Sequence, residues 1–367
     1  MYYKQYGNKD FKVSAVGMGC MRFDEELVKA GRFNECAEVA LYAHERGINY
    51  FDSAPTYCGD KSEEILGMAL CQLPRDSFIV SSKTNFGQIG KPPTKEGFFR
   101  RLETSLTRLR VDYIDVYHLW CMMSLEQYEM QCGTMYGWFE EAKAQGLIKR
   151  IAVSSHMPGN ELEKVVEQDK FEAMLIGYNA LNHRFRQSGI SAAHEKGMAV
   201  VAMNAVAGGL IPRNPERFAY LAEGTDLTPT QAALRFVASH KEITVALNGF
   251  TTKRHVDDAV LALEGLVEQP ASELNEKWKN EGEMLRDMCT GCGYCDHCPQ
   301  DIHIPRLMDA YNRKLLGEDM AEAVGHWGLD PKDADKCVAC GQCESLCTQH
   351  LPIIERLREV AQAKMEE

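Results

Sequence analysis

Short apolar runs recur along the chain between residues 13 and 248, and polar or amphipathic segments separate them. Runs of this length with polar flanks are typical of buried β-strands. The segments between them carry apolar residues on one helical face and charged residues on the other, as in Phe33–Arg46 and Leu162–Gln168. The eight predicted strands are Val13–Met18, Ile48–Asp52, Ser77–Ser82, Tyr113–Leu119, Arg150–Ser154, Ala173–Tyr178, Ala199–Met203 and Ile243–Asn248.

Glycine marks several joints at which a predicted helix leads into the next strand. Gly47, Gly146 and Gly197 stand there, and glycine is the residue that ends a helix in left-handed geometry. Eight βα units are the signature of a (β/α)8 TIM barrel. A doubly wound open sheet is disfavoured because no Gly-x-Gly-x-x-Gly opens a helix after the first strand. We therefore predict an α/β fold with a barrel over residues 1–268.

Two runs of cysteine near the C-terminus predict two iron–sulfur clusters. A [4Fe–4S] cubane needs four thiolates, and Cys-x-x-Cys-x-x-Cys supplies three from one short loop. Structural zinc sites normally use two separated Cys-x-x-Cys pairs, so this spacing fits zinc poorly. In two-cluster ferredoxins the fourth ligand comes from the other run. The sets are then Cys289, Cys292 and Cys295 with Cys347, and Cys337, Cys340 and Cys343 with Cys298.

The composition changes at residues 268–272, which read as a linker. A charged helix is predicted over Glu273–Met288, and amphipathic helices over Pro305–Leu316 and Pro352–Lys364. Residues 273–367 are therefore predicted to form a small, mostly helical ferredoxin-like domain.

Charge and composition exclude some functions. A formal net charge of −12 leaves no basic surface for phosphates, which argues against a nucleic-acid partner. No apolar run is long enough for a membrane span, and Met1–Lys12 lacks the apolar core of a secretory signal. Fourteen cysteines without such a signal favour a reducing, cytoplasmic location.

Residues at the C-terminal ends of the predicted strands carry a family resemblance. Barrel enzymes place their chemistry at these ends. The chain resembles the aldo/keto reductase family, and within it the prokaryotic subgroup whose barrel precedes a ferredoxin-like domain. The stretches that carry the resemblance are Val16–Arg22, Asn49–Ala54, Ser62–Gly67, Asp112–Asp115, Ser154–His156, Tyr178–Asn182 and Gly208-Gly209.

The resemblance implies hydride transfer between a nicotinamide and a carbonyl. It assigns Tyr57 as the proton donor or acceptor, with its pKa lowered by Lys83, which Asp52 holds in place. The alternative is that Asp52 and Lys83 form a structural ion pair and that Tyr57 only packs.

The fourth catalytic position departs from the family. The aligned histidine is replaced by Trp120, and His118 lies two residues earlier on the same strand. Because side chains alternate along a strand, His118 is expected to point in the same direction as Trp120 but one layer deeper in the barrel. It either reaches Tyr57 or Lys83, or is a satisfied core histidine.

The nicotinamide contacts also depart from the family. Leu175 stands where a glutamine holds the carboxamide, and Met203 stands where an aromatic residue stacks on the ring. Arg254 remains as a candidate for a phosphate, and Ser154 and Ser155 for the carboxamide.

Polar or aromatic residues at the strand ends are the candidate substrate contacts. They are Trp120, His156 and Asn179. Cys20, Cys58 and Cys121 also fall at strand ends, where isolated cysteines are usually buried hydrophobes but three could form a reactive or metal-binding rim.

Three functions fit these residues. The first is a cytoplasmic oxidoreductase that acts on a small carbonyl or hydroxyl substrate while two [4Fe–4S] clusters pass electrons from a donor such as a ferredoxin or flavoprotein. A flavin is not excluded, because clusters pass single electrons whereas a nicotinamide gives a hydride. The second is a conventional NADPH-dependent aldehyde or ketone reductase with structural clusters. The third is an electron carrier or sensor with a degenerate barrel.

Overall fold

Eight parallel strands close into a barrel in the computed structural model, which describes residues 1–277 and 287–363. Neighbouring strands pair in chain order, and β10 returns to pair with β3. The fold class predicted from the apolar runs is confirmed. The barrel strands are β3 (Val16–Gly19), β4 (Tyr50–Asp52), β5 (Ile79–Thr84), β6 (Ile114–Met122), β7 (Ile148–Ser155), β8 (Ala173–Gly177), β9 (Ala199–Met203) and β10 (Val245–Asn248).

A short hairpin at the N-terminus was not predicted. Its strands β1 (Tyr3–Gln5) and β2 (Lys12–Ser14) pair antiparallel before the barrel begins. The Tyr6 ring stacks on Phe11 at 5.0 Å between centroids and on Tyr50 at 6.2 Å, which adds an aromatic layer to the barrel interior. Strands of three residues are too short for a periodic signal, so the pattern did not reveal them.

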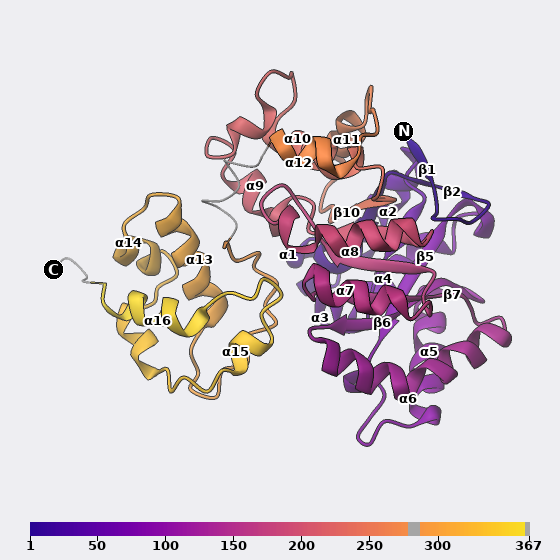
Figure 1. Cartoon of the computed structure of the whole chain (residues 1–367), viewed down its shortest axis with the longest axis horizontal. Coiled ribbons are helices and arrows are strands. Elements are labelled where there is room, and N and C mark those ends of the chain that lie inside the picture. The colour runs from indigo at the N-terminus through magenta and orange to yellow at the C-terminus, as the bar shows by residue number, and fades with distance from the viewer. Residues whose placement is uncertain (278–286, 364–367) are drawn as a thin grey trace.

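Helices cover the outside of the barrel (Figure 1). Several begin at a hydroxyl that caps the first turn, as Thr94, Ser124 and Thr228 do for α5, α6 and α10. The barrel-side helices are α1 (Glu25–Lys29), α2 (Phe33–Glu45), α3 (Tyr57–Asp60), α4 (Ser62–Leu70), α5 (Lys95–Leu109), α6 (Leu125–Ala144), α7 (Gly159–Glu167), α8 (His183–Glu195), α9 (Leu210–Arg213), α10 (Pro229–Ser239), α11 (Lys253–Ala262) and α12 (Ala271–Lys277).

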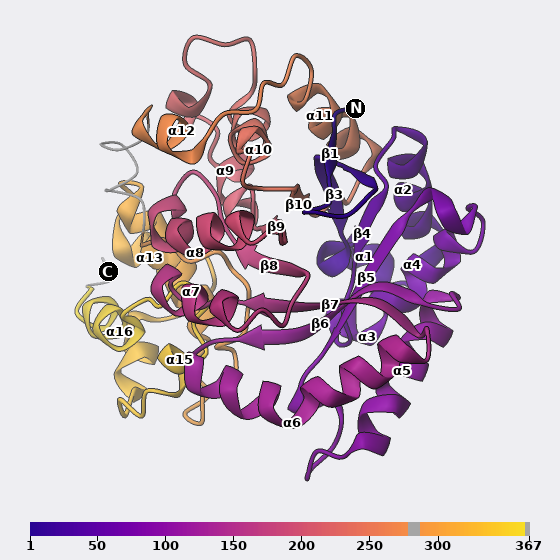
Figure 2. The same ribbon diagram turned by 45° about the vertical axis from the view of Figure 1, so that its right-hand side comes forward.

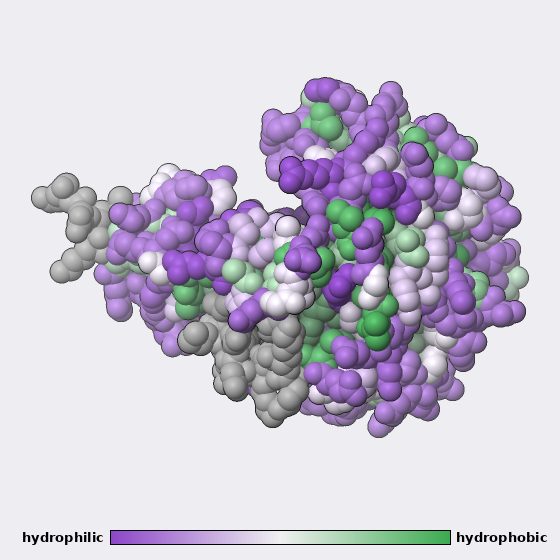
Figure 3. All heavy atoms as spheres, turned by 90° about the horizontal axis from the view of Figure 1, so that it is seen from above, coloured by the Kyte–Doolittle hydropathy of each residue, from purple (hydrophilic) through white to green (hydrophobic). Residues whose placement is uncertain are grey.

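The C-terminal domain is small and helical and has a core of its own (Figure 1). It contains α13 (Ile304–Leu315), α14 (Met320–Gly325), α15 (Gln342–Ser345) and α16 (Ile353–Ala361). The first turns of the predicted helix over Glu273–Met288 correspond to α12, and residues 278–286 of that prediction lie outside the described residues. From above, hydrophilic residues cover much of both domains and a notch separates them on one side (Figure 3).

The C-terminal domain lies beside the end of the barrel where the strands finish. The arrows of β6, β7 and β8 point toward it in Figure 2. Among the described residues, no helix combines the length and apolar character needed to cross a membrane.

Candidate functional site

A buried ion pair lies at the ends of β4 and β5. Lys83 Nζ donates to Asp52 Oδ1 at 2.5 Å and to the Ser53 carbonyl at 2.6 Å. Lys83 is 0% exposed, and Ser81 donates to the other Asp52 oxygen at 2.5 Å. Removing one partner of such a pair typically costs about 3–5 kcal/mol of stability, because a charge is left buried alone. The pair lies beside the Tyr57 ring, whose centroid is 5.2 Å from Lys83 Nζ.

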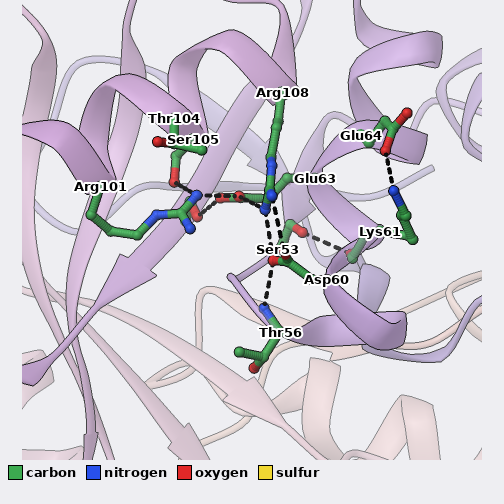
Figure 4. Close-up of polar contacts among 12 residues, drawn as sticks. Ser53, Thr56, Asp60, Lys61, Glu63, Glu64, Arg101, Thr104, Ser105 and Arg108 are labelled. Atoms are coloured by element: carbon green, nitrogen blue, oxygen red, sulfur yellow. Dashed lines mark hydrogen bonds and ion pairs between the residues drawn. The ribbon is translucent and has the colours of Figure 1, made fainter. Parts of the chain in front are cut away.

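Tyr57 is carried by a constrained loop after β4. Thr56, Cys58 and Asp60 all have positive φ, a conformation that costs energy in residues other than glycine. Arg108 holds Asp60 through two bonds of 2.6 and 2.7 Å, and Asp60 in turn accepts from the Thr56 amide at 3.4 Å (Figure 4). This network stabilises the strained loop and so fixes where Tyr57 enters the barrel mouth.

The protonation of Tyr57 differs from what the resemblance implies. Burial raises the pKa of Tyr57 well above its ordinary value, and neighbouring Tyr294 and Asp52 add to the shift. Lys83, which is paired with Asp52 and lies 5.2 Å from the Tyr57 ring centroid, does not reverse this shift. A phenol in this state keeps its proton at neutral pH. It is a weaker acid than a free tyrosine, so it gives up the proton only to an oxygen on which negative charge develops.

Of the positions that the sequence left open for His118, the structure supports the one beside Lys83. The histidine is fully buried next to Lys83 in the sheet register, and its polar neighbour is the backbone of Val153. Burial and the Lys83 charge lower the pKa of His118 well below its ordinary value, which keeps the ring neutral. Trp120 does reach Tyr57, since the two rings meet edge to face at 5.8 Å.

Tyr294, from the first cysteine run, reaches into this site. Its ring packs edge to face on His156 at 6.1 Å, and its phenol is a hydrogen-bonding neighbour of Tyr57. Cys121 at the end of β6 lies close to both Tyr294 and Cys292. No local pattern predicted this contact, because an aromatic residue between two cysteines of a cluster motif is expected only to pack. The chain thus brings a second hydroxyl to the tyrosine, where the family histidine is missing.

A cavity of about 500 Å³ opens from Asp52 and Tyr57 across the barrel mouth. Leu175 and Met203 line it, at the positions where the resemblance expects a glutamine and an aromatic ring. Its further lining comes from the ends of β3, β9 and β10 and from the segments that follow them, and includes Arg22, Gly208, Gly209, Arg213, Thr251, His255 and Asp258.

Arg254, Ser154 and Ser155 are not among the residues that line this cavity. Arg254 is exposed on α11, while its neighbour His255 faces the cavity instead. Ser155 is engaged with the backbone, donating to the Met122 carbonyl and accepting from the Met157 amide. A role for these three residues in cofactor binding stays a prediction.

His156 and Asn179 lie at the contact between the domains and not along the cavity. The His156 carbonyl accepts from His350 at 2.9 Å, and burial lowers the pKa of its ring to about 3. Asn179 donates to the Asn204 carbonyl and accepts from the Leu181 amide, so its amide group is already engaged. Substrate contact by either residue stays a prediction.

The rim cysteines do not form one site. Cys58 donates to the Cys20 and Met21 carbonyls, while Cys121 lies against the C-terminal domain. No three His, Cys, Asp or Glu side chains of the described residues converge on a single metal ion.

The eight C-terminal cysteines border two cavities. Cys289, Cys292, Cys295 and Cys347 line one, which we call the proximal cavity because Cys292 neighbours Cys121 of the barrel. Cys298, Cys337, Cys340 and Cys343 line the other, the distal cavity, which Cys295 also borders. A cubane spreads four thiolates over four corners, so these two sets fit two clusters better than two single ions. The grouping agrees with the predicted exchange of fourth ligands.

Close backbone approach joins the cluster loop to the barrel. Gly208 has φ +66°, and a Cβ there would lie 2.0 Å from the Thr290 carbonyl oxygen, so no other residue fits. Arg22 donates to the carbonyls of Thr290 and Gly291 at 3.4 and 3.2 Å. The loop between Cys289 and Cys292 is therefore held on the wall of the barrel cavity.

Comparison with known proteins gives two family matches. Residues 15–279 match the model of the aldo/keto reductase family, and residues 288–351 match that of the 4Fe-4S dicluster domain. The uncharacterized oxidoreductase YqkF of Bacillus subtilis is 28% identical over 217 residues, which is 58% of this chain and 67% of that protein. The NADH-specific methylglyoxal reductase of Escherichia coli is 24% identical over 221 residues, which is 56% of this chain and 67% of that protein.

Solved structures agree with the barrel. An aldo-keto reductase from Bacillus halodurans, in its holo form, superposes with a TM-score of 0.62 and 25% identity, over 76% of this chain and 95% of that one. An aldo-keto reductase from Klebsiella pneumoniae in complex with NADPH superposes with a TM-score of 0.61 and 20% identity, over 76% of this chain and 95% of that one.

Proposed function

The chain belongs to the aldo/keto reductase family and carries a C-terminal 4Fe-4S dicluster domain, and from that premise we propose that it is a cytoplasmic oxidoreductase fed with electrons through its clusters. It acts on a small carbonyl or hydroxyl substrate at the barrel mouth. The observation that supports this best is the contact between the two domains. Tyr294 neighbours both Tyr57 of the barrel and Cys292 of the first cysteine run.

Two [4Fe–4S] clusters, held by the proximal and distal sets, would supply single electrons. The proximal set is joined to the wall of the barrel cavity by Arg22, which donates to the carbonyls of Thr290 and Gly291. The distal set includes Cys340, which is exposed, and Val338, which is 62% exposed. An external donor such as a ferredoxin or flavoprotein therefore has access to the distal set.

The residues of the barrel mouth divide the remaining work. Reduction of a carbonyl to an alcohol takes two electrons, which come from the external donor, and two protons. Tyr57 donates the proton that goes to the substrate oxygen, the proton that goes to carbon comes from solvent, and the pair of Lys83 with Asp52 keeps the ring in position. Tyr294 supplies the second hydroxyl that orients the carbonyl, since Trp120 occupies the position of the family histidine. The Tyr294 and Trp120 rings and the cluster loop limit the access of water.

A conventional NADPH-dependent reductase is the competing function, since the cavity has the family position for a nicotinamide. Its lining argues against tight binding: Leu175 has no group to bond a carboxamide and Met203 has no ring to stack on one. An electron carrier with a degenerate barrel is disfavoured, because a buried Asp52–Lys83 pair is costly to keep without a use.

Titration with NADPH separates these functions. We expect no saturable change in nicotinamide fluorescence below about 1 mM, because each missing hydrogen bond costs about tenfold or more in affinity. Leu175→Gln restores the family's carboxamide ligand and is expected to tighten binding by at least about tenfold. Low-micromolar binding by the unaltered protein would instead favour the conventional reductase.

A further inference from the structure

Arg186 on α8 is a buried charge that the proposed chemistry does not use. The residue is 0% exposed. Its guanidinium donates to four backbone carbonyls, those of Met157 at 3.2 Å, Gly177 at 3.1 Å, His156 at 2.8 Å and Thr348 at 2.9 Å. Four of the five N–H donors of an arginine are thereby used.

No carboxylate balances this charge in the part of the chain that the structure describes. No ion pair of Arg186 is found there, and burial alone accounts for the lowering of its pKa to about 10. The Phe185 ring stacks on its guanidinium, with 4.8 Å between the guanidinium carbon and the ring centroid. Buried charges in proteins are normally paired, because carbonyl dipoles satisfy the hydrogen bonds but leave the net charge uncompensated.

The bond to Thr348 directs the charge toward the proximal cavity. Thr348 follows the ligand Cys347 and lines that cavity beside it. Arg22 is another cation near the set. It acts on Cys289 and Cys292, but it is exposed to solvent, so its charge is screened.

We propose that Arg186 is the counter-charge of the proximal cluster and raises its reduction potential. A cubane held by four thiolates is an anion that becomes more negative on reduction. A fixed, buried positive charge beside it stabilises the reduced state more than the oxidised one. On the distal side, the charge that acts on Cys343 is the carboxylate of Glu344, which disfavours added negative charge there. This inference rests on the cluster assignment within the proposed function and needs no substrate.

Redox titration of Arg186→Gln, followed by EPR, tests the proposal. We expect the reduction potential of the proximal cluster to fall by at least about 59 mV, which for one electron is a tenfold change in the ratio of reduced to oxidised cluster. The potential of the distal cluster is expected to stay unchanged. Cys347→Ser identifies the proximal step, because it removes a ligand of that set alone. Arg235→Gln is the matched control. Arg235 lies on the outer helix α10 and also donates to backbone carbonyls, those of Ala262 and Glu264. Its replacement is expected to shift neither potential.

Arg186→Lys separates charge from packing. It keeps the charge and loses most of the carbonyl bonds, so the proximal potential is expected to stay near that of the unaltered protein. Equal shifts in the lysine and glutamine variants, or none in glutamine, would overturn the proposal. The Arg186→Gln variant could fail to assemble the proximal cluster. In that case, a proximal cluster with the normal potential in Arg186→Lys supports the proposal, and the absence of the cluster in Arg186→Lys overturns it. Because activity is not measured, failure here leaves the proposed function to its own tests.

Discussion

Tyr57→Phe is expected to lower turnover of small aldehydes and ketones by about 10²–10⁴-fold, the usual contribution of a positioned proton donor. The phenylalanine ring keeps the edge-to-face contact with Trp120 and the packing beside Lys83, so only the hydroxyl is lost. The assay is anaerobic reduction of a panel of small aldehydes and ketones with dithionite-reduced methyl viologen as electron source. Iron content and the visible absorption of the clusters should be unchanged.

A matched control is Tyr42→Phe. It removes a phenol that bonds Asp257 on the outside of the barrel, away from Asp52 and Lys83, and should leave turnover intact. Full activity in Tyr57→Phe would refute the role of Tyr57 as proton donor, and equal losses in both variants would point to a general effect on folding.

Cys347→Ser is expected to reduce the iron content from about eight to about four per chain, because each cubane takes four irons and four thiolates. Cys347 is the better choice than Cys295, which borders both cavities. Cys347 is also buried in the core of the C-terminal domain, so loss of the metal should loosen that domain. Iron analysis and limited proteolysis measure the two effects.

Cys71→Ser serves as the control, since Cys71 is an exposed thiol of the barrel outside both cysteine runs. It should keep all the iron and the proteolytic resistance of the unaltered protein. Retention of eight irons in Cys347→Ser would show that Cys347 is not a ligand and that the exchange of fourth ligands between the runs is wrong.

Local patterns predicted the barrel well because each strand is a buried apolar run and each joint is a short turn. Gly47, Gly146 and Gly197 do take positive φ at those joints, as expected of helix caps. Strand ends placed Asp52 and Lys83 near each other, and the family resemblance predicted that they pair. The resemblance supplied Tyr57, whose position depends on a strained loop that no periodic pattern reveals.

What the sequence left out depends on how the two domains meet. The approach of Tyr294 to Tyr57 and of Arg186 to Thr348 joins residues more than a hundred positions apart, and no local spacing encodes it. For the same reason His156 was predicted to face the cavity, whereas the C-terminal domain covers it. Burial raises the pKa of Tyr57, whereas the resemblance implies a lysine that lowers it, and the catalytic role of Tyr57 stays a prediction.

The presence of two clusters beside a barrel reductase site is tested most directly by the electronic and EPR spectra of anaerobically purified protein, together with an iron and flavin count. We predict about eight irons per chain and, on reduction, signals of two magnetically interacting [4Fe–4S] clusters. Two zinc ions and no iron in protein prepared without oxygen would contradict it.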